Sequence, residues 1–367
     1  MVRSNSPVER PTVPPPDRRE IAWGSDALAE MLNRLELPYV SLTPGASYRG
    51  LHDSLVNYLG NEQPEMVVAL HEEHAVAIAH GYAKVTEQPL AVALHANVGL
   101  MHSTMALFNA FCDRVPMLVL GATGPVDAAR RRPWIDWIHT AADQGALIRG
   151  FVKWDDQPAS VAAALESLVR ANLLTRSYPC APTYVCLDAA MQEAPLSSAP
   201  SFPDLARHRP PAPPGADEAS LAAIAQILAA AERPLILAGR VGRSERAWGL
   251  RISLAERLEA GVLTDLKVAA AFPTEHRLHP AIPGTFLPAE GAELLRGADV
   301  VLALDWVDLG GTLAQAFGGE PVAPRVISIS GDAALHNGWS KDHFALAPID
   351  LAVAAHPDPV VEALLPL

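Results

Sequence analysis

Short apolar runs alternate with longer stretches of helical periodicity between residues 21 and 190. The apolar runs that are typical of buried parallel strands occupy residues 39–42, 66–70, 90–94, 117–120 and 183–187. Helical patterns lie before and between them, at residues 25–35, 73–85, 103–112 and 160–174. Strands that are separated by helices predict a doubly wound α/β sheet.

A second unit of the same kind is predicted over residues 218–367. Its strand patterns cover residues 234–238, 261–264, 300–304 and 325–329, and its helical patterns cover residues 219–231, 247–260 and 358–365. Residues 191–217 contain seven prolines and little apolar periodicity, so we interpret them as a linker. The first 20 residues are rich in proline and charge and are expected to form a disordered arm. The fold class is therefore α/β, with two doubly wound parallel-sheet domains.

The composition is that of an ordinary globular protein, with 50% hydrophobic and 19% charged residues in a chain of 367. No apolar run approaches the roughly 20 residues that cross a bilayer. The first 20 residues also hold no apolar stretch of the signal-peptide type. The three cysteines are scattered, which argues against a disulfide framework, and we expect a cytoplasmic protein. A net charge of −13 argues against nucleic acid or a membrane surface as a partner.

One stretch after the strand pattern at residues 66–70 combines a carboxylate with a series of small residues. It reads HEEHAVAIAHGYAK from His71 onward and places Glu72 where a helix begins. The small residues allow another backbone or a flat ring to approach the helix closely. A lone glutamate at a helix start is more typical of simple capping, so the residue by itself favours that role.

The surrounding motifs resemble the thiamine diphosphate (ThDP) enzymes of the acetolactate synthase, pyruvate decarboxylase and benzoylformate decarboxylase superfamily. The matching residues of the pyrimidine-binding domain are Thr43-Pro44-Gly45, His71-Glu72, Ala75, Gly81-Tyr82-Ala83-Lys84, Gly99, Asn109-Ala110 and the strand at 116–121. The segments ERPLILAGRVG and LAERLEAGVLTDLKVAAAFPTEHRLHPAIPG are similar to the Rossmann-like central domain of these enzymes. The resemblance implies a pyrimidine-binding domain over 21–190 and a central domain over 218–367.

The resemblance also implies roles for individual residues. Glu72 would hydrogen-bond N1′ of the aminopyrimidine and so activate the cofactor, which cleaves or forms C–C bonds. His95 matches a histidine in the active site of the benzoylformate decarboxylase branch and would move protons there; the alternative is a histidine that only closes a strand. That branch has a serine where this chain has Ala46, although Ser47 follows directly. The residues expected at the cofactor are Pro44, Gly45, Glu72, Gly99, His102 and Asn109.

Two further patterns have features of binding sites. His71 and His74 have the His-x-x-His spacing of zinc ligands, but no cysteine or third histidine follows at a useful spacing, so we predict no metal site there. Gly239-Arg240-Val241-Gly242 lacks the third glycine of a dinucleotide fingerprint. The arginines at 240, 243 and 246 could meet the phosphates of a nucleotide, but packing is the favoured role for this turn.

Gly331-Asp332-Ala333 is the nearest match to the Gly-Asp-Gly motif that helps to hold the Mg²⁺ of the cofactor's diphosphate in this superfamily. Only 34 residues follow Ala333, too few for another doubly wound domain, so we interpret the motif as the last turn of the central domain. We therefore expect a smaller partner subunit that carries the diphosphate-binding domain and Mg²⁺. The pyrimidine domains are expected to pair in a homodimer.

These expectations define a subunit of a heteromeric ThDP-dependent C–C lyase or carboligase that acts on a small-molecule substrate. The reaction would be of the 2-oxo acid decarboxylase type or of the 2-hydroxy ketone or hydroxyacyl lyase type. One alternative is a non-catalytic regulatory protein on a ThDP-enzyme scaffold. Another is a protein whose central domain binds an adenine nucleotide or acyl-CoA.

Overall fold

The computed structural model describes residues 11–334 and 346–367, so residues 1–10 of the predicted arm lie outside the described part. The rest of that arm includes a short 3-10 helix, Pro16–Arg18. The described chain divides into two compact units. Unit 1 runs to Arg176 and includes Cys180–Pro210, whereas unit 2 comprises Ser177–Pro179 and the residues from Pro211 onward.

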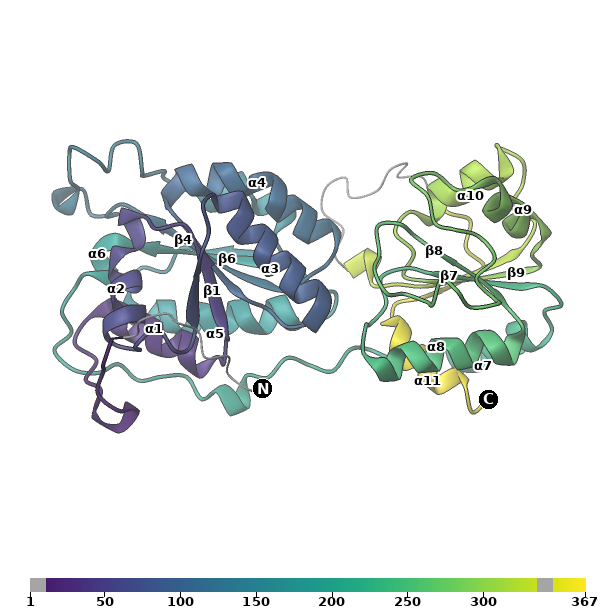
Figure 1. The fold of residues 1–367 in the computed structure, drawn as a ribbon, viewed down its shortest axis with the longest axis horizontal. Coiled ribbons are helices and arrows are strands. Elements are labelled where there is room, and N and C mark those ends of the chain that lie inside the picture. Colours follow the sequence, from purple (N-terminus) through teal and green to yellow (C-terminus); the bar gives the residue numbers. More distant parts are fainter. Residues whose placement is uncertain (1–10, 335–345) are drawn as a thin grey trace. The chain divides into compact units, whose positions relative to one another are not determined.

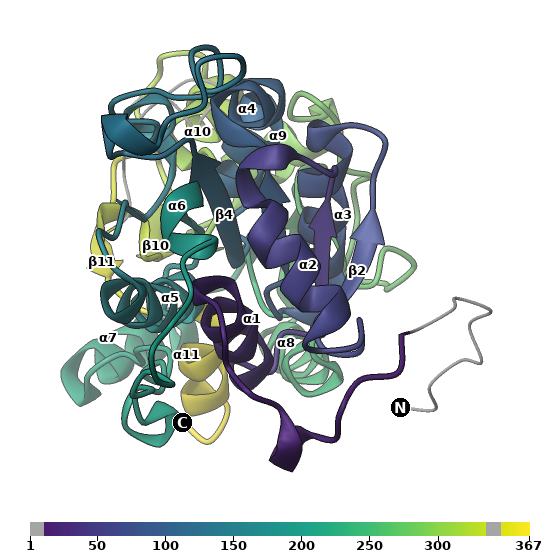
Figure 2. The same cartoon turned by 90° about the vertical axis from the view of Figure 1, so that its left-hand side faces the viewer.

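Unit 1 is built on a parallel sheet of six strands in the order β2-β1-β3-β4-β6-β5 (Figure 1). The strands are β1 Tyr39–Leu42, β2 Glu65–Val68, β3 Ala91–Leu94, β4 Met117–Thr123, β5 Trp154–Asp156 and β6 Pro182–Asp188. The helices are α1 Gly24–Arg34, α2 Arg49–Asn57, α3 Glu72–Thr86, α4 Ala96–Cys112, α5 Val161–Arg176 and the short α6 Ala189–Gln192. Helix α2 packs beside α1, as Figure 2 shows.

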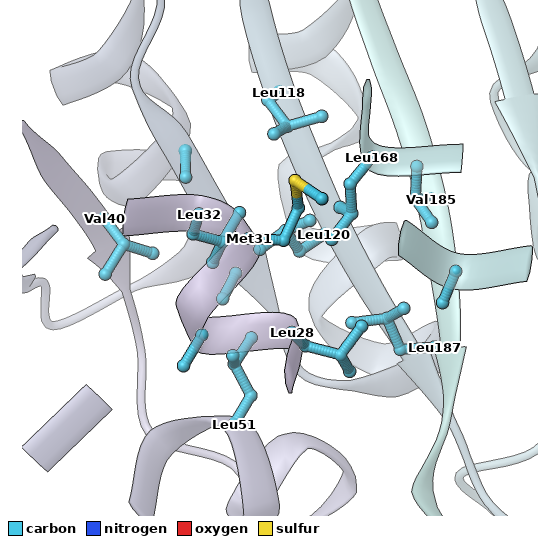
Figure 3. Close-up of a cluster of buried hydrophobic side chains, with 14 of the residues drawn as sticks. Leu28, Met31, Leu32, Val40, Leu51, Leu118, Leu120, Leu168, Val185 and Leu187 are labelled. Carbon is cyan, nitrogen blue, oxygen red and sulfur yellow. The ribbon is translucent and has the colours of Figure 1, made fainter. Parts of the chain in front are cut away.

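Helices cover both faces of this sheet because its strands alternate apolar side chains between the two sides. Along β4, Leu118 and Leu120 belong to a buried cluster with α1 and α5 (Figure 3). Met117 and Val119 belong instead to a second cluster, formed with α3 and α4. Both faces of the sheet are therefore buried, which explains why its strands appear in the sequence as continuous apolar runs.

Unit 2 repeats this plan with five parallel strands in the order β11-β10-β9-β7-β8 (Figure 1). The strands are β7 Pro234–Ala238, β8 Gly261–Thr264, β9 Val300–Leu304, β10 Arg325–Ile329 and β11 Leu351–Val353. The helices are α7 Glu218–Ala229, α8 Glu245–Leu258, α9 Ala289–Gly297, α10 Leu309–Phe317 and α11 Pro357–Leu364. Two buried clusters again lie on opposite faces, one with α7, α8 and α11 and the other with α9 and α10.

The structure confirms the predicted fold class of two parallel-sheet α/β domains. Helix α4 starts at Ala96, seven residues earlier than the periodicity predicts, and α2, α6, α9, α10, β5 and β11 were not predicted. Asp26 sits inside the first turn of α1, and its carboxylate accepts the N–H groups of Ala22 and Trp23. Within the described ranges, no helix is both long and apolar enough to cross a bilayer.

Candidate cofactor-binding site

Most of the candidate residues lie at one edge of the unit 1 sheet. Strands β2, β1, β3 and β4 are neighbours and all run parallel, so their carboxyl ends meet at this edge. Four chain segments follow these ends. They are the turn at 43–48 after β1, His71 and Glu72 after β2, His95 after β3, and the loop at 124–147 after β4. The sheet thereby brings together residues that are far apart in the sequence.

Glu72 is the first residue of α3, and only 9% of its surface is exposed. Its Oε2 atom lies 3.4 Å from Nδ1 of His102, which α4 supplies. A Cβ atom added at Gly99 would lie 3.0 Å from Cγ of Glu72, so α4 approaches the carboxylate closely only because residue 99 is glycine. The cap of α3 is provided by His71, whose Nδ1 accepts the N–H of Glu73. Glu72 is therefore free of the capping role and is held against α4.

Tyr48 adds a buried neutral group beside Glu72. Its hydroxyl donates to the carbonyl of Thr43, which fixes the ring in the turn after β1. Burial, and secondarily the charge of Glu72, raises the pKa of the Tyr48 phenol well above its usual value. Tyr48 stays un-ionised at neutral pH and adds no negative charge to that of Glu72.

His95 links β3 to α4 and is fixed by the turn after β1. Its Nδ1 atom lies 2.9 Å from Oγ of Ser47 and 3.4 Å from the backbone nitrogen of the same residue. A Cβ atom at Gly45 would lie only 2.4 Å from Cβ and Cγ of His95. Glycine is therefore required at position 45 to leave room for the histidine side chain. Its backbone conformation does not require glycine, because it is extended, with φ −155°, and any residue adopts that conformation.

The loop after β4 contributes a residue that the sequence did not indicate, His139. Its ring centroid lies 4.7 Å from that of His95, with the planes at 37°. Burial lowers the pKa of His95, and the neighbouring His139 lowers it further, against a raising effect of Glu72. His95 is therefore a neutral imidazole at physiological pH. The sequence could have indicated His139 in one way. The residue lies in the loop after β4, and because β4 is the neighbour of β3, that loop follows the same edge of the sheet as His95.

The predicted site residues are not all brought together. Glu72, Gly99 and His102 are in contact. Gly45 packs directly against the side chain of His95, which is also hydrogen-bonded to Ser47. Pro44 is exposed at the start of the same turn. Asn109 is exposed near the end of α4, seven residues after His102 and so about 10 Å further along the helix. Its assignment to the cofactor ring stays a prediction.

Three potential metal ligands lie close together here, although the sequence predicted no metal site. The ligand atoms of His71, Glu72 and His102 all lie within 4.8 Å of one another. However, Nδ1 of His71 accepts the N–H of Glu73, so the neutral ring carries its proton on Nε2. Neither nitrogen of His71 then offers a free lone pair to a metal ion. The arrangement fits a hydrogen-bonding site for an organic group better than a metal centre.

The glycine turn after β7 in unit 2 is filled by the protein's own groups. Arg240 is buried and pairs with Asp305 and Asp332, at N···O distances of 3.4 and 3.1 Å. Arg243 donates to the carbonyl of Ala269, and Arg246 pairs with a glutamate of α11. A Cβ atom at Gly239 would lie 2.2 Å from the carbonyl oxygen of Asp305. These contacts support the packing role for the turn.

Gly331 and Asp332 lie in the turn after β10, as the sequence indicated. The Asp332 carboxylate is engaged with Arg240. The turn therefore contributes to the ion pairs of unit 2.

Comparison with known proteins decides the family. Residues 22–147 match the model of the thiamine pyrophosphate enzyme N-terminal TPP binding domain, and residues 221–364 match the model of the central domain of the same enzymes. The chain belongs to the thiamine pyrophosphate enzymes. This confirms the resemblance found in the sequence motifs, and it places Glu72, Gly99 and His102 inside the matched TPP-binding domain.

Curated relatives include a benzoylformate decarboxylase of Pseudomonas aeruginosa, 27% identical over 296 residues, which cover 73% of this chain and 53% of the relative. The acetolactate synthase large subunit of Corynebacterium glutamicum is 25% identical over 290 residues, covering 77% and 44%. The chain thus spans about half the length of the curated relatives it matches.

Solved structures show the same fold. The ThDP-dependent 4-hydroxybenzoylformate decarboxylase of Rhodococcus jostii RHA1 superposes with a TM-score of 0.74 at 24% identity, over 94% of this chain and 62% of that chain. At this level of sequence identity the structural similarity shows the fold alone.

Proposed function

We propose that this chain is the pyrimidine-binding component of a ThDP-dependent C–C lyase or carboligase, and that Glu72 activates the cofactor. The observation that carries the proposal is the placement of Glu72. It is buried at the start of α3, relieved of capping by His71 and held against Gly99 and His102, within the matched TPP-binding domain. Its carboxyl group would hydrogen-bond N1′ of the aminopyrimidine. The bound cofactor supplies an electron sink for cleavage of a bond next to a carbonyl carbon.

The donors and acceptors of the site suit an aminopyrimidine. The ring offers nitrogen acceptors and an amino donor, and Glu72 and His102 can bind such groups with their polar atoms. Asn97, in the first turn of α4, has a buried Oδ1 atom without a hydrogen-bond partner among the described residues. An unpartnered buried acceptor is costly unless a ligand or water supplies the donor. Asn97 is therefore a further residue that can hold the cofactor.

We further propose that a smaller partner subunit completes the site with the diphosphate-binding domain and Mg²⁺, and that two pyrimidine domains pair. Large apolar side chains are exposed next to the site residues. Leu70, which precedes His71, is 95% exposed, and Trp137, two residues before His139, is 75% exposed. Met101, adjacent to His102, is 57% exposed. Apolar surface of this kind typically marks a protein interface, which supports a partner that covers this edge.

The reaction is proposed to be decarboxylation of a 2-oxo acid, or cleavage or ligation of a 2-hydroxy ketone or 2-hydroxyacyl compound. The alternative of a nucleotide-binding protein is less well supported. Arg240, Arg243 and Arg246, the candidate phosphate ligands of unit 2, already make contacts within that unit.

The proposal is tested by co-expressing the chain with the proposed partner and measuring ThDP- and Mg²⁺-dependent turnover of 2-oxo acids and acyloins. Glu72→Gln should lower turnover about 10²-fold or more, because the amide cannot exchange a proton. The matched control is Glu73→Gln, which makes the same change at the exposed neighbouring position of α3 and should retain activity. Equal activity of the two variants would refute the role of Glu72.

A further inference from the structure

The hydrogen bonds of Ser47 fix the tautomer of His95. The Ser47 hydroxyl oxygen accepts the N–H of Ala96 at 3.1 Å, so its own proton points elsewhere. Nδ1 of His95 lies 2.9 Å from this oxygen and also faces the backbone N–H of Ser47 at 3.4 Å. A nitrogen that faces two donors acts as an acceptor. The neutral ring of His95 therefore carries its proton on Nε2.

His139 has the opposite tautomer. Its Nδ1 atom lies 2.9 Å from the carbonyl oxygen of Ile135. A carbonyl oxygen can only accept a hydrogen bond, so Nδ1 of His139 must carry the proton. Nε2 of the neutral ring is then bare and basic. A histidine whose Nδ1–H is held by an acceptor while Nε2 stays bare is the arrangement that general bases use.

The loop that carries His139 is anchored on both sides of it. Asp136 is 2% exposed, and its carboxylate accepts the backbone N–H of Arg132 and pairs with the guanidinium of the same residue. A Cβ atom at Gly124 would lie 2.4 Å from Oγ1 of Thr140, so the residue that follows His139 packs against the end of β4. Close anchoring on either side holds the imidazole next to His95.

We propose that His139 is the proton-accepting imidazole of this site and that His95 acts as a neutral hydrogen-bond donor. His95 is poorly suited to accept a proton, because its bare nitrogen faces two donors of Ser47, one of which is a backbone N–H that cannot turn away. Its Nε2–H can instead donate to a carbonyl or carboxylate oxygen of a substrate. The assignment of both roles to a reaction rests on the proposed function.

The proposed proton transfer involves His139 and a hydroxyl group of the substrate. Nε2 of His139 takes the proton of a substrate hydroxyl group, both electrons of the O–H bond stay on the oxygen, and the ring becomes an imidazolium. In the reverse direction the imidazolium returns the proton to the oxyanion. The buried carboxylate of Asp136 lies three residues before His139 in the same loop and interacts electrostatically with it. The two rings disfavour double protonation, because like charges at this distance repel.

The tautomers can be measured on the full chain without cofactor, partner or substrate. Long-range ¹H–¹⁵N correlation spectra of the histidine-labelled protein distinguish the two neutral tautomers, and His95→Gln and His139→Gln assign the signals. We expect the Nε2–H form for His95 and the Nδ1–H form for His139. The Nδ1–H form of His95, or the Nε2–H form of His139, would overturn the inference while leaving the role of Glu72 intact.

A second experiment uses the active complex. His139→Gln should lower turnover about 10²-fold or more and abolish the acidic limb of the pH profile, because glutamine cannot accept a proton. His95→Gln should lose less, because the glutamine amide still donates a hydrogen bond. His208→Gln, in the exposed segment before unit 2, is the control for histidine removal. A larger loss for His95→Gln than for His139→Gln, or an unchanged pH profile in His139→Gln, would refute the assignment.

Discussion

Replacement of Gly45 by alanine should destabilise unit 1 because the new methyl group has no room beside His95. The added Cβ atom would lie 2.4 Å from Cβ and Cγ of the histidine and 2.7 Å from Nδ1. Carbon atoms in contact are ordinarily about 3.5–4.0 Å apart, so the two segments must separate by roughly 1 Å. Because His95 Cβ is attached directly to the backbone, a rotamer change cannot relieve this overlap.

The loss of stability in Gly45→Ala has two contributions. Overpacking of a close contact costs about 1–3 kcal/mol. The separation also breaks the hydrogen bond between Ser47 and His95, which adds about 1 kcal/mol. Backbone strain adds nothing, because Gly45 is extended. We therefore expect the free energy of unfolding of unit 1 to fall by about 2–4 kcal/mol.

The assay is urea unfolding of the full chain, with the transition of unit 1 followed by native-state proteolysis or by its own fluorescence change. The matched control is Gly81→Ala, the same substitution at a site in α3 where the added Cβ meets nothing within 4 Å. That variant should be more stable by about 0.5–1 kcal/mol, because alanine restricts the unfolded chain and favours the helix. A Gly45→Ala variant as stable as the wild type would refute the steric reasoning.

Two further predictions concern charges. Arg240→Met should lower the stability of unit 2 by about 3–5 kcal/mol in urea unfolding, because it leaves the carboxylate of Asp305 buried without its cationic partner. Asp113→Asn should cost about 1–2 kcal/mol at pH 7. Although burial raises the pKa of Asp113, hydrogen bonds from His80 and Lys84 lower it more. Because the folded pKa is depressed, the stabilisation is present above the unfolded value of about 3.9 and is lost as the pH falls through the folded value.

Each charge prediction has a control at an exposed position. Arg246→Met removes a surface ion pair of unit 2 and should change stability by less than about 1 kcal/mol. Asp53→Asn, on the exposed side of α2, should show no pH-dependent difference from the wild type. A stable Arg240→Met variant would contradict the packing role of the buried pair. A cost of Asp113→Asn that persists undiminished at low pH would contradict the charged contacts of Asp113.

The strands of both sheets could be predicted closely because burial on both faces makes them continuous apolar runs. The bounds of β1, β7, β8, β9 and β10 agree with the sequence pattern residue for residue. Helix α2 was not predicted because it buries only a few of its nine residues. Helix α10 was not predicted because it contains two glycines. Strand β11 is three residues long, too short to show a period. Such elements are stabilised by tertiary packing more than by local preference.

The candidate site was predictable only in part. The position of Glu72 at a helix start follows from the local motif. The contacts of Ser47, Tyr48 and His139 do not, because they depend on which strand ends lie side by side in the sheet. The role expected for His95 also changes, since its tautomer depends on the donors of Ser47 and no sequence pattern reports those.

The most direct test of Glu72 as cofactor activator needs no knowledge of the substrate. In the complex with its diphosphate-binding partner, the rate of hydrogen–deuterium exchange at C2 of bound ThDP is measured by NMR after rapid quenching, at saturating cofactor. Exchange should slow about 10²-fold or more in Glu72→Gln and stay at the wild-type rate in Glu73→Gln. Equal exchange rates in the wild type and in Glu72→Gln, with ThDP bound, would contradict the central claim.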